Sequence, residues 1–268
     1  MPRRTRLDAE LVRRGLARSR EHASQLIADG RVTVRGNLAA KPATGVETDA
    51  PVVVRDLDDD PDWASRGAHK LLGALERFDV PVKDRRCLDA GASTGGFTDV
   101  LLRGGARQVV AADVGRGLLV WRLQTDDRVV VLDRTNVRAL TPEQTGGVAD
   151  LVVADLSFIS LRLVLPALLS CAAEDADLLP MVKPQFEVGK ERLGAGGVVR
   201  DPELRKSAVL DVLRAAGELG LRAHGVVASP LPGPSGNVEY FAWLRRGEPL
   251  GDQDAAALVE TAVREGPQ

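Results

Sequence analysis

Two lysines and two acidic residues stand where predicted helices or strands begin or end, in a chain where lysine is scarce. The sequence holds only six lysines but thirty arginines. Lys183 and Asp155 each directly follow a run of apolar residues that is typical of a buried strand. A crowded, partly desolvated ammonium can lose its proton near neutral pH and act as a general base, whereas a guanidinium stays charged. Lys70, at the start of a predicted helix, and Glu239, at the start of a late strand, extend the set. Each residue alone fits equally well a charge that reaches solvent.

A glycine-rich turn, Asp89 to Gly96, comes where a predicted strand leads into a predicted helix. Glycines there let the backbone pass close to a ligand, and a helix N-terminus favours acceptor groups such as a carboxylate. Asp89 would repel a pyrophosphate but can pair with an ammonium group, which favours an amino-acid-bearing cofactor over NAD or ATP. Asp113 follows 22 residues after Gly91, a distance suited to binding a ribose diol. A turn of this kind is equally often a nucleotide site or a tight turn.

The same turn also fits a serine hydrolase. Residues 91–95 match the G-x-S-x-G nucleophile elbow, and Ser93, Asp155 and His224 follow the chain order of that fold's catalytic triad. Two observations oppose this hypothesis. A hydrolase elbow follows several strands of its own sheet, whereas only one predicted helix of this domain comes first. His224 also lies inside an apolar strand pattern, which is typical of a structural histidine.

The elements that would position these residues alternate between helix and strand from Ser65 onward. Apolar strands separated by helices predict an α/β domain with a mostly parallel sheet that is covered on both faces. Ligands of such sheets bind at the carboxyl ends of the strands. The predicted strands are Cys87–Asp89, Gln108–Asp113, Arg128–Leu132, Asp150–Asp155, Asp177–Lys183, Arg222–Ala228 and Glu239–Leu244. The predicted helices are Leu71–Phe78, Phe97–Arg103, Leu118–Gln124, Leu161–Leu169, Pro202–Leu219 and Asp252–Arg264.

The N-terminal part of the chain predicts a small α+β module of two helices and a sheet. Thr5 with Asp8 resembles a capping box for the first helix, and Ser19 is the predicted N-cap of the second. Residues 31–35 and 51–54 have the alternation and composition of strands.

Charge divides this part of the chain sharply. Residues 1–41 carry a formal charge of +6, and residues 42–62 carry −6. A small module with so much positive charge suits a polyphosphate partner such as a nucleic acid, and it equally suits a solvated helix face. We place the module at 1–60, a linker at 61–64 and the larger domain at 65–268.

Composition excludes several other classes. Hydrophobic residues make up 44% and charged residues 28% of the chain, as in a folded globular protein. The longest apolar stretch, Leu163 to Ala173, is about half as long as a membrane-spanning helix. The N-terminus has no apolar core of a secretory signal, so we expect a cytoplasmic protein. Cys87 and Cys171 lie far apart, with no second cysteine or histidine at ligand spacing, so we expect neither a disulfide nor a metal site.

The stretch from Arg6 to Gly36, followed by Lys41-Pro42, resembles the RNA-binding domain named after ribosomal protein S4. The pieces Arg-Leu-Asp, Ser-Arg, Leu-Ile and Gly-x-Val-x-Val occur in the expected order. Residues 1–60 contain no aromatic side chain, which favours recognition of RNA shape through phosphates and 2′-hydroxyls over base stacking. The resemblance assigns RNA binding to Arg4, Arg6, Arg18, Arg20 and Lys41.

The whole chain resembles the TlyA family of rRNA cytidine-2′-O-methyltransferases, historically called haemolysins. The pieces that match are SRGAHKL, DAGASTGGFT, DLSFIS, VKPQFEVG and GPSGNVEYF. Lys70, Asp155, Lys183 and Glu239 stand in the order of the Lys-Asp-Lys-Glu tetrad of FtsJ-like ribose methyltransferases. The resemblance implies a class I Rossmann-like fold with a seven-stranded sheet, S-adenosylmethionine as the cofactor, and Lys183 as general base.

The resemblance also implies the surroundings of the site. The residues assigned to the cofactor are Asp89, Gly91, Ser93, Thr94, Gly95, Gly96, Phe97, Asp113, Asn136, Asp155 and Phe158. Residues that would extend the RNA track across the larger domain are Arg66, Arg134, Arg138 and Lys190. The implied partner is ribosomal RNA in ribosomal subunits, with a cytidine in each subunit as substrate. No stable protein partner is implied, and we expect a monomer.

Two further functions stay open on the sequence alone: a non-catalytic RNA-binding protein, and a membrane-active haemolysin. A pore former needs a long apolar helix, a strongly amphipathic basic helix or barrel strands, and the sequence pattern shows none of these convincingly.

Overall fold

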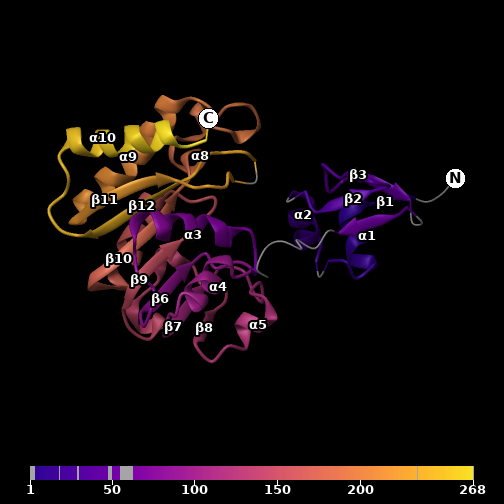
Figure 1. Cartoon of the computed structure of the whole chain (residues 1–268), viewed down its shortest axis with the longest axis horizontal. Coiled ribbons are helices and arrows are strands. Elements are labelled where there is room, and N and C mark those ends of the chain that lie inside the picture. Colours follow the sequence, from indigo (N-terminus) through magenta and orange to yellow (C-terminus); the bar gives the residue numbers. More distant parts are fainter. Residues whose placement is uncertain are drawn as a thin grey trace. The chain divides into compact units, whose positions relative to one another are not determined.

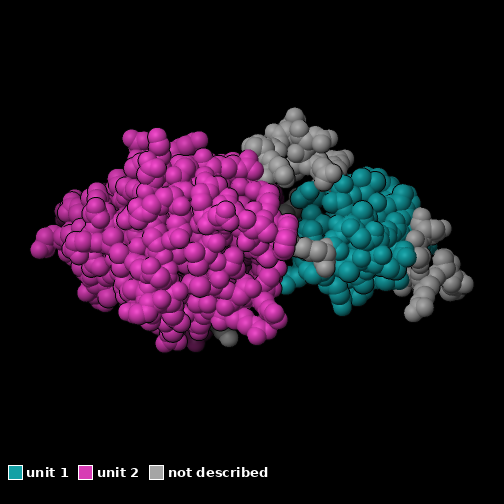
Figure 2. Space-filling model, turned by 90° about the horizontal axis from the view of Figure 1, so that it is seen from below, with its two compact units in different colours: residues 1–62 teal, residues 63–268 magenta. Residues whose placement is uncertain are grey.

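The chain divides into two compact units, residues 1–62 and residues 63–268 (Figure 2). The computed structural model describes residues 4–17, 19–28, 30–47, 50–54, 63–233 and 235–267, without the side chains of Arg4, Lys190 and Ala195. Trp63 and Ala64, the second half of the predicted linker, belong to the larger unit. Residues 61 and 62 of that linker lie outside the described residues.

The smaller unit is built from short elements around two helices (Figure 1). A three-stranded antiparallel sheet has the order β3-β2-β5, and β1 pairs separately with β4. Leu7, Leu11, Leu26, Ile27 and Val32 form the centre of its core. The elements are β1 (Arg4–Arg6), α1 (Leu7–Arg13), α2 (Arg20–Ala28), β2 (Val32–Val34), β3 (Asn37–Leu38), β4 (Gly45–Glu47) and β5 (Val52–Val54).

The helix and strand pattern of this unit is confirmed, but the predicted capping box is wrong. Thr5 lies within β1, and the residue before α1 is Arg6, which makes no side-chain cap. The Asp8 carboxylate instead accepts hydrogen bonds from the side chains of Arg6 and Arg20. Ser19 is a true cap, because its Oγ accepts from the backbone N–H of His22 at 3.1 Å.

The larger unit holds a seven-stranded sheet with the order β11-β12-β10-β9-β6-β7-β8, covered by helices (Figure 1). Its strands are β6 (Arg86–Ala90), β7 (Gln108–Ala112), β8 (Val129–Leu132), β9 (Ala149–Ala154), β10 (Ala172–Val182), β11 (Leu221–Ala228) and β12 (Tyr240–Arg246). Its helices are α3 (Gly67–Phe78), α4 (Gly96–Arg103), α5 (Trp121–Gln124), α6 (Pro142–Thr145), α7 (Leu165–Ser170), α8 (Pro184–Glu187), α9 (Pro202–Glu218) and α10 (Asp252–Glu265). Short 3-10 turns are η1 (Val137–Ala139), η2 (Leu161–Leu163), η3 (Lys190–Arg192) and η4 (Ala195–Gly197). The α/β fold class is confirmed.

The sheet buries both of its faces, as its apolar strands predict. Along β6, Cys87 packs into a core with α3 and α4, while the next residue, Leu88, packs into a core with α7, α9 and α10. Successive side chains of a strand point to opposite faces, so nearly every position of an inner strand must be apolar. Burying one such leucine stabilises the fold by about 1.5–3 kcal/mol.

Two predicted helices are shorter than expected. The predicted helix Leu161–Leu169 is broken at Val164 into η2 and α7, because Pro166 has no N–H to continue a helix and stands instead in the first turn of α7. The predicted helix Leu118–Gln124 begins only at Trp121, because Val120 is extended and donates its N–H to the carbonyl of Thr94, and the side chain of Leu119 packs against Gly95.

The register brings the carboxyl ends of the inner strands to one edge. Ala90, Ala112 and Ala154, each the last residue of its strand, are neighbours across β6, β7 and β9. β12 runs antiparallel to β10, with Tyr240 beside Val182. The residue before β12 therefore lies at the same edge as the residue after β10.

Candidate active site

Lys183 lies just beyond the end of β10 and is surrounded by acceptors. Its Nζ lies 2.6 Å from Asp155 Oδ1. It donates a hydrogen bond to Ser157 Oγ at 3.0 Å and lies 4.0 Å from Glu239 Oε1. The side chain of Lys183 is only 8% exposed. The amine is therefore held in one place by contacts on several sides.

Glu239 joins the two lysines of the site. Its Oε2 accepts from Lys70 Nζ at 2.6 Å, and its Oε1 accepts from Gln185 Nε2 at 3.3 Å. The carboxylate is fully buried. Gly233 leaves the room for it, because a Cβ at that position would lie 2.5 Å from Glu239 Oε1. All four residues of the predicted tetrad are thus brought together in one chain of contacts.

Each tetrad residue comes from a different element at the same edge of the sheet. Lys70 lies near the start of α3, Asp155 directly follows β9, Lys183 directly follows β10 and Glu239 directly precedes β12. Two positive and two negative side chains compensate one another. Buried charges are tolerated only when paired, so removal of one partner would leave the other uncompensated.

The glycine turn lies at the neighbouring position of this edge, after β6. Gly91 has a φ of 89° and Gly95 a φ of 101°, in the left-handed region that favours glycine. A Cβ on Gly91 would lie 2.5 Å from the carbonyl oxygen of Asp155. The turn therefore packs directly against the strand end that carries Asp155, so the two parts of the site are in contact.

Asp89, the acid before the glycines, is completely buried. Thr98 Oγ1 donates to its Oδ2 at 2.7 Å, while its Oδ1 has no hydrogen-bond partner among the described residues. Burial raises the pKa of Asp89 to about 7, and the nearby carboxylate of Asp155 contributes in the same direction. An unpaired buried carboxylate oxygen is costly, and it fits a site that accepts a cationic group.

The other residues predicted around the cofactor have varied surroundings. Asp113 accepts from the backbone N–H of Ser93 at 2.9 Å and of Gly115 at 2.7 Å, so its carboxylate ties the glycine turn to the loop after β7. The backbone carbonyl of Thr94 accepts from Val120 N–H. Gly96 begins α4.

The aromatic and amide residues predicted to bind the cofactor range from buried to almost fully exposed. Phe97 is buried with its ring 5.9 Å from Phe241, so it packs in the core. Asn136 is exposed, and its side chain accepts from the backbone N–H of Arg138 at the start of η1. Phe158 is 91% exposed, has a φ of 64°, and lies with its ring centroid 5.2 Å from that of Phe186. A bulky residue with positive φ and an exposed ring is unfavourable in isolation, which is typical of functional sites.

Comparisons with known proteins match both units. The profile of FtsJ-like methyltransferases matches residues 63–246, and the profile of the S4 domain matches residues 5–52. The 16S/23S rRNA (cytidine-2′-O)-methyltransferase TlyA of Mycobacterium tuberculosis is 62% identical over 100% of both chains. The chain belongs to the TlyA family of FtsJ-like methyltransferases.

Further TlyA relatives cover nearly the same length. YqxC of Bacillus subtilis, named as a candidate rRNA methyltransferase, is 40% identical over 97% of this chain and 94% of its own. A solved structure from Streptococcus thermophilus, described as a candidate hemolysin, is 35% identical with a TM-score of 0.75 and covers 99% of this chain and 98% of its own. The historical hemolysin name therefore accompanies the methyltransferase fold.

Most side chains that the S4 and TlyA resemblances assign to RNA lie at the surface. Lys41, Arg66, Arg134 and Arg138 are exposed. Arg6 and Arg20 are 52% and 61% exposed while each contacts Asp8. These hydrogen bonds, with Arg6 the largest contributor, hold the pKa of Asp8 well below its usual range. Arg18 and the side chains of Arg4 and Lys190 lie outside the described residues.

The rival hydrolase triad is not assembled. Ser93 follows β6, whereas His224 lies within β11, four strands away in the sheet order. Neighbouring strands are about 4.8 Å apart, which separates the two positions by roughly 19 Å. His224 instead lies against Trp243, with ring centroids 5.2 Å apart. Within the ranges that the structure describes, no helix is both long and apolar enough to cross a membrane.

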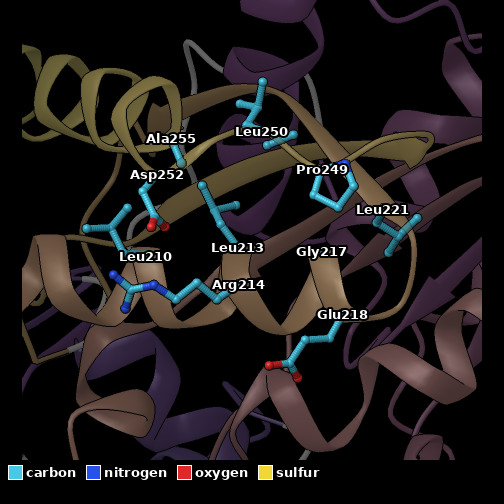
Figure 3. A pocket seen from close by; sticks show the side chains of 11 residues that line it. Leu210, Leu213, Arg214, Gly217, Glu218, Leu221, Pro249, Leu250, Asp252 and Ala255 are labelled. Atoms are coloured by element: carbon cyan, nitrogen blue, oxygen red, sulfur yellow. The ribbon is translucent and has the colours of Figure 1, made fainter.

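A separate hollow lies between α9, β11 and α10 (Figure 3). Leu213, Leu221 and Leu250 line it, with Arg214 and Asp252 among its charged neighbours. None of the predicted site residues lines this pocket. It therefore plays no part in the site at the carboxyl edge.

Sequence reasoning missed several residues that contact the site. Ser157 binds Lys183, Gln185 binds Glu239, and Thr98 binds Asp89. Val114 directly follows Asp113 and is 70% exposed, so it presents apolar surface after β7. Ser157 and Gln185 each stand two residues after a predicted catalytic position, and that spacing is the signal that could have found them.

Proposed function

We propose that this protein methylates the 2′-hydroxyl of a cytidine in ribosomal RNA, with S-adenosylmethionine as the methyl donor. The observation that carries the proposal is that two features are in contact at one edge of the sheet. The first is the buried amine and carboxylate chain of Lys70, Glu239, Lys183 and Asp155. The second is the glycine turn that packs against Asp155.

The residues around the glycine turn fit S-adenosylmethionine. Asp89 Oδ1 is a buried acceptor with no partner among the described residues, which suits the ammonium of an amino-acid portion. The N-terminus of α4 suits the carboxylate of the same portion. Asp113, Asn136, Val114 and Phe158 supply polar and apolar surface for a nucleoside. When bound, S-adenosylmethionine supplies an electrophilic methyl group.

Lys183 acts as the general base in this proposal. A ribose 2′-hydroxyl is a weak acid, and its oxygen becomes a good nucleophile only as its proton leaves. The Lys183 amine would accept that proton, and the oxygen would bond to the methyl carbon that bound S-adenosylmethionine supplies as the methyl–sulfur bond breaks and S-adenosylhomocysteine leaves. Asp155 orients the amine through the 2.6 Å contact and stabilises the ammonium that results.

Lys70 and Glu239 are the other two residues of the tetrad. Glu239 lies between the two amines and fixes their separation. Lys70 donates to Glu239 Oε2 at 2.6 Å and so anchors the carboxylate that lies 4.0 Å from Lys183 Nζ. Because each group is held by packing and hydrogen bonds, the acceptor and donor atoms can be aligned with little loss of entropy.

The smaller unit supplies RNA affinity in this proposal. Arg6, Arg20 and Lys41 present exposed positive charge suited to phosphates. Its S4 match and the rRNA substrates named for the Mycobacterium tuberculosis and Bacillus subtilis relatives support RNA as the partner. Access to a ribose inside a folded helix requires the nucleotide to leave its stack.

The test is methyl transfer to purified ribosomal subunits. Small and large subunits from cells that lack the protein are incubated with it and with tritiated S-adenosylmethionine, and 2′-O-methylated positions are mapped. We expect label in cytidine of both subunits with the wild-type chain and none with Lys183→Ala. RNA binding without label in either subunit would favour a non-catalytic RNA-binding protein.

A further inference from the structure

Thr98 lies in the first turn of α4, and its side chain contacts Asp89, the residue before the glycine turn. It is fully buried, and its Oγ1 donates to Asp89 Oδ2 at 2.7 Å. The same Asp89 is fully buried, and its other oxygen has no partner in the part of the chain that the structure describes. Thr98 thus fixes the Oδ2 atom of Asp89, which leaves the Oδ1 atom available to a ligand.

The charges around Asp89 oppose its ionisation. Burial is the largest effect, and Asp155 at the end of β9 and Asp113 at the end of β7 add negative charge from the two flanking strands. The hydroxyl and the backbone N–H of Thr98, from α4, act in the opposite direction and stabilise the carboxylate. Thr98 is therefore the residue that counteracts burial most strongly at this position.

Packing alone does not explain a threonine here. Valine has nearly the same shape and would bury a methyl group where threonine buries a hydroxyl, and an apolar group is the cheaper one to bury. The hydroxyl is tolerated because it hydrogen-bonds to the carboxylate. A hydrogen bond to a charged group is stronger than one between neutral groups.

We propose that Thr98 is a positioning residue for the methyl donor: its hydroxyl fixes one oxygen of Asp89, favours the ionised carboxylate, and turns the free oxygen toward the ammonium of the donor's amino-acid portion. The inference rests on the proposed function, since it requires a ligand that carries such an ammonium. Thr98 touches neither the ligand nor the reacting atoms and acts only through Asp89.

The experiment compares two ligands in three proteins. S-adenosylhomocysteine carries the amino-acid portion without the reactive methyl group, and methylthioadenosine lacks the amino-acid portion. Their affinities are measured by titration calorimetry between pH 6 and pH 9 for the full-length wild type, Thr98→Val and Thr98→Ser. Circular dichroism confirms that each variant is folded, and Thr98→Ala replaces the valine variant if that one does not fold.

The expected result is selective and depends on pH. In Thr98→Val, the pH at which affinity for S-adenosylhomocysteine rises moves about one unit upward, so affinity falls about fivefold at pH 7 and about tenfold at pH 6. Affinity for methylthioadenosine stays within twofold of wild type. Thr98→Ser restores both the affinity and the pH dependence, because it keeps the hydroxyl.

Two outcomes would overturn the inference. An unchanged pH dependence in Thr98→Val would show that the hydroxyl does not act on Asp89. An equal loss of affinity for both ligands would show a general structural effect. Failure of the wild type to bind S-adenosylhomocysteine at any pH would instead contradict the proposed function, so the two failures are distinguishable.

Discussion

Lys183 Nζ and Asp155 Oδ1 lie 2.6 Å apart, although the two residues follow separate strands and stand 28 positions apart in the chain. β9 and β10 are parallel neighbours, so the residues that follow them emerge side by side. The same Asp155 presses its carbonyl oxygen against Gly91 of the glycine turn. One residue therefore contacts both the amine and the turn, which brings the two halves of the proposed chemistry within reach of each other.

The Lys183→Ala variant should abolish methyl transfer. We expect the rate to fall by about 100-fold to 10,000-fold, because the group that accepts the proton is removed while the binding surfaces are untouched. The measurement is tritium incorporation into ribosomal subunits, with RNA affinity and S-adenosylhomocysteine affinity measured in parallel. Lys206→Ala is the matched control, since that lysine pairs with Glu203 and Glu260 away from the site. Retained activity in Lys183→Ala would remove the general base from the proposal.

The Gly233→Ala variant should impair the site through Glu239. The added Cβ would lie 2.5 Å from Glu239 Oε1, so the carboxylate must move away from one or both lysines. We expect a drop in methyl transfer of at least about tenfold, with an unchanged far-ultraviolet circular dichroism spectrum. Gly251→Ala is the control, because a Cβ there meets nothing within 4 Å. Equal activity of the two variants would argue that the position of Glu239 is unimportant.

The Arg20→Ala variant should weaken RNA binding and spare the cofactor. Its exposed guanidinium can contact one phosphate, so the slope of log affinity against log salt should fall by about one. Filter binding with ribosomal RNA at several salt concentrations measures the slope, and calorimetry measures S-adenosylhomocysteine affinity. Arg214→Ala is a matched control, since Arg214 is equally exposed and pairs with Asp211 on α9. A change in cofactor affinity would contradict this division of labour.

Stability should depend on pH through Asp89. Its pKa is about 7 in the folded chain, against 3.8 for an ordinary aspartate side chain. Between these pH values the folded state keeps a proton that the unfolded state has lost, so this residue makes stability decrease as pH rises from about 4 to about 7. Urea unfolding of the free protein at several pH values, compared with Asp89→Asn, isolates the effect. The difference between the two proteins should change by up to about 1.4 kcal/mol per pH unit in that window and level off above pH 7. A flat difference would contradict the raised pKa.

The edge of the sheet could be predicted from the sequence because local signals agreed there. Apolar runs that end in Asp155 and Lys183 predicted strands with charged residues at their carboxyl ends, and the structure has both. The elements that failed depend on long-range contacts. Thr5 has the type of a helix cap, but pairing of β1 with β4 takes it into a strand. Phe97 resembles a ligand contact in the motif, yet Phe241 from a distant strand covers it.

The partners of the site residues were harder to predict. Ser157, Gln185 and Thr98 have no periodic pattern of their own, and their role appears only when two segments meet. Gly233 is similar, since its lack of a side chain matters only because Glu239 fills the space. Sequence patterns specify which side chains reach an edge, whereas the packing of loops decides what each one touches there.

The single reversed strand of the sheet has a consequence for how the site is built. β12 is seven residues long, or about 24 Å from end to end. Had it run in the same direction as its neighbours, the position that precedes it would have emerged on the far side of the domain, remote from both lysines. Because β12 is reversed, Glu239, in the loop that precedes β12, lies at the same edge of the sheet as Lys183, in the segment that follows β10. Insertions in that loop could thus alter the reach of one acidic group without disturbing any strand.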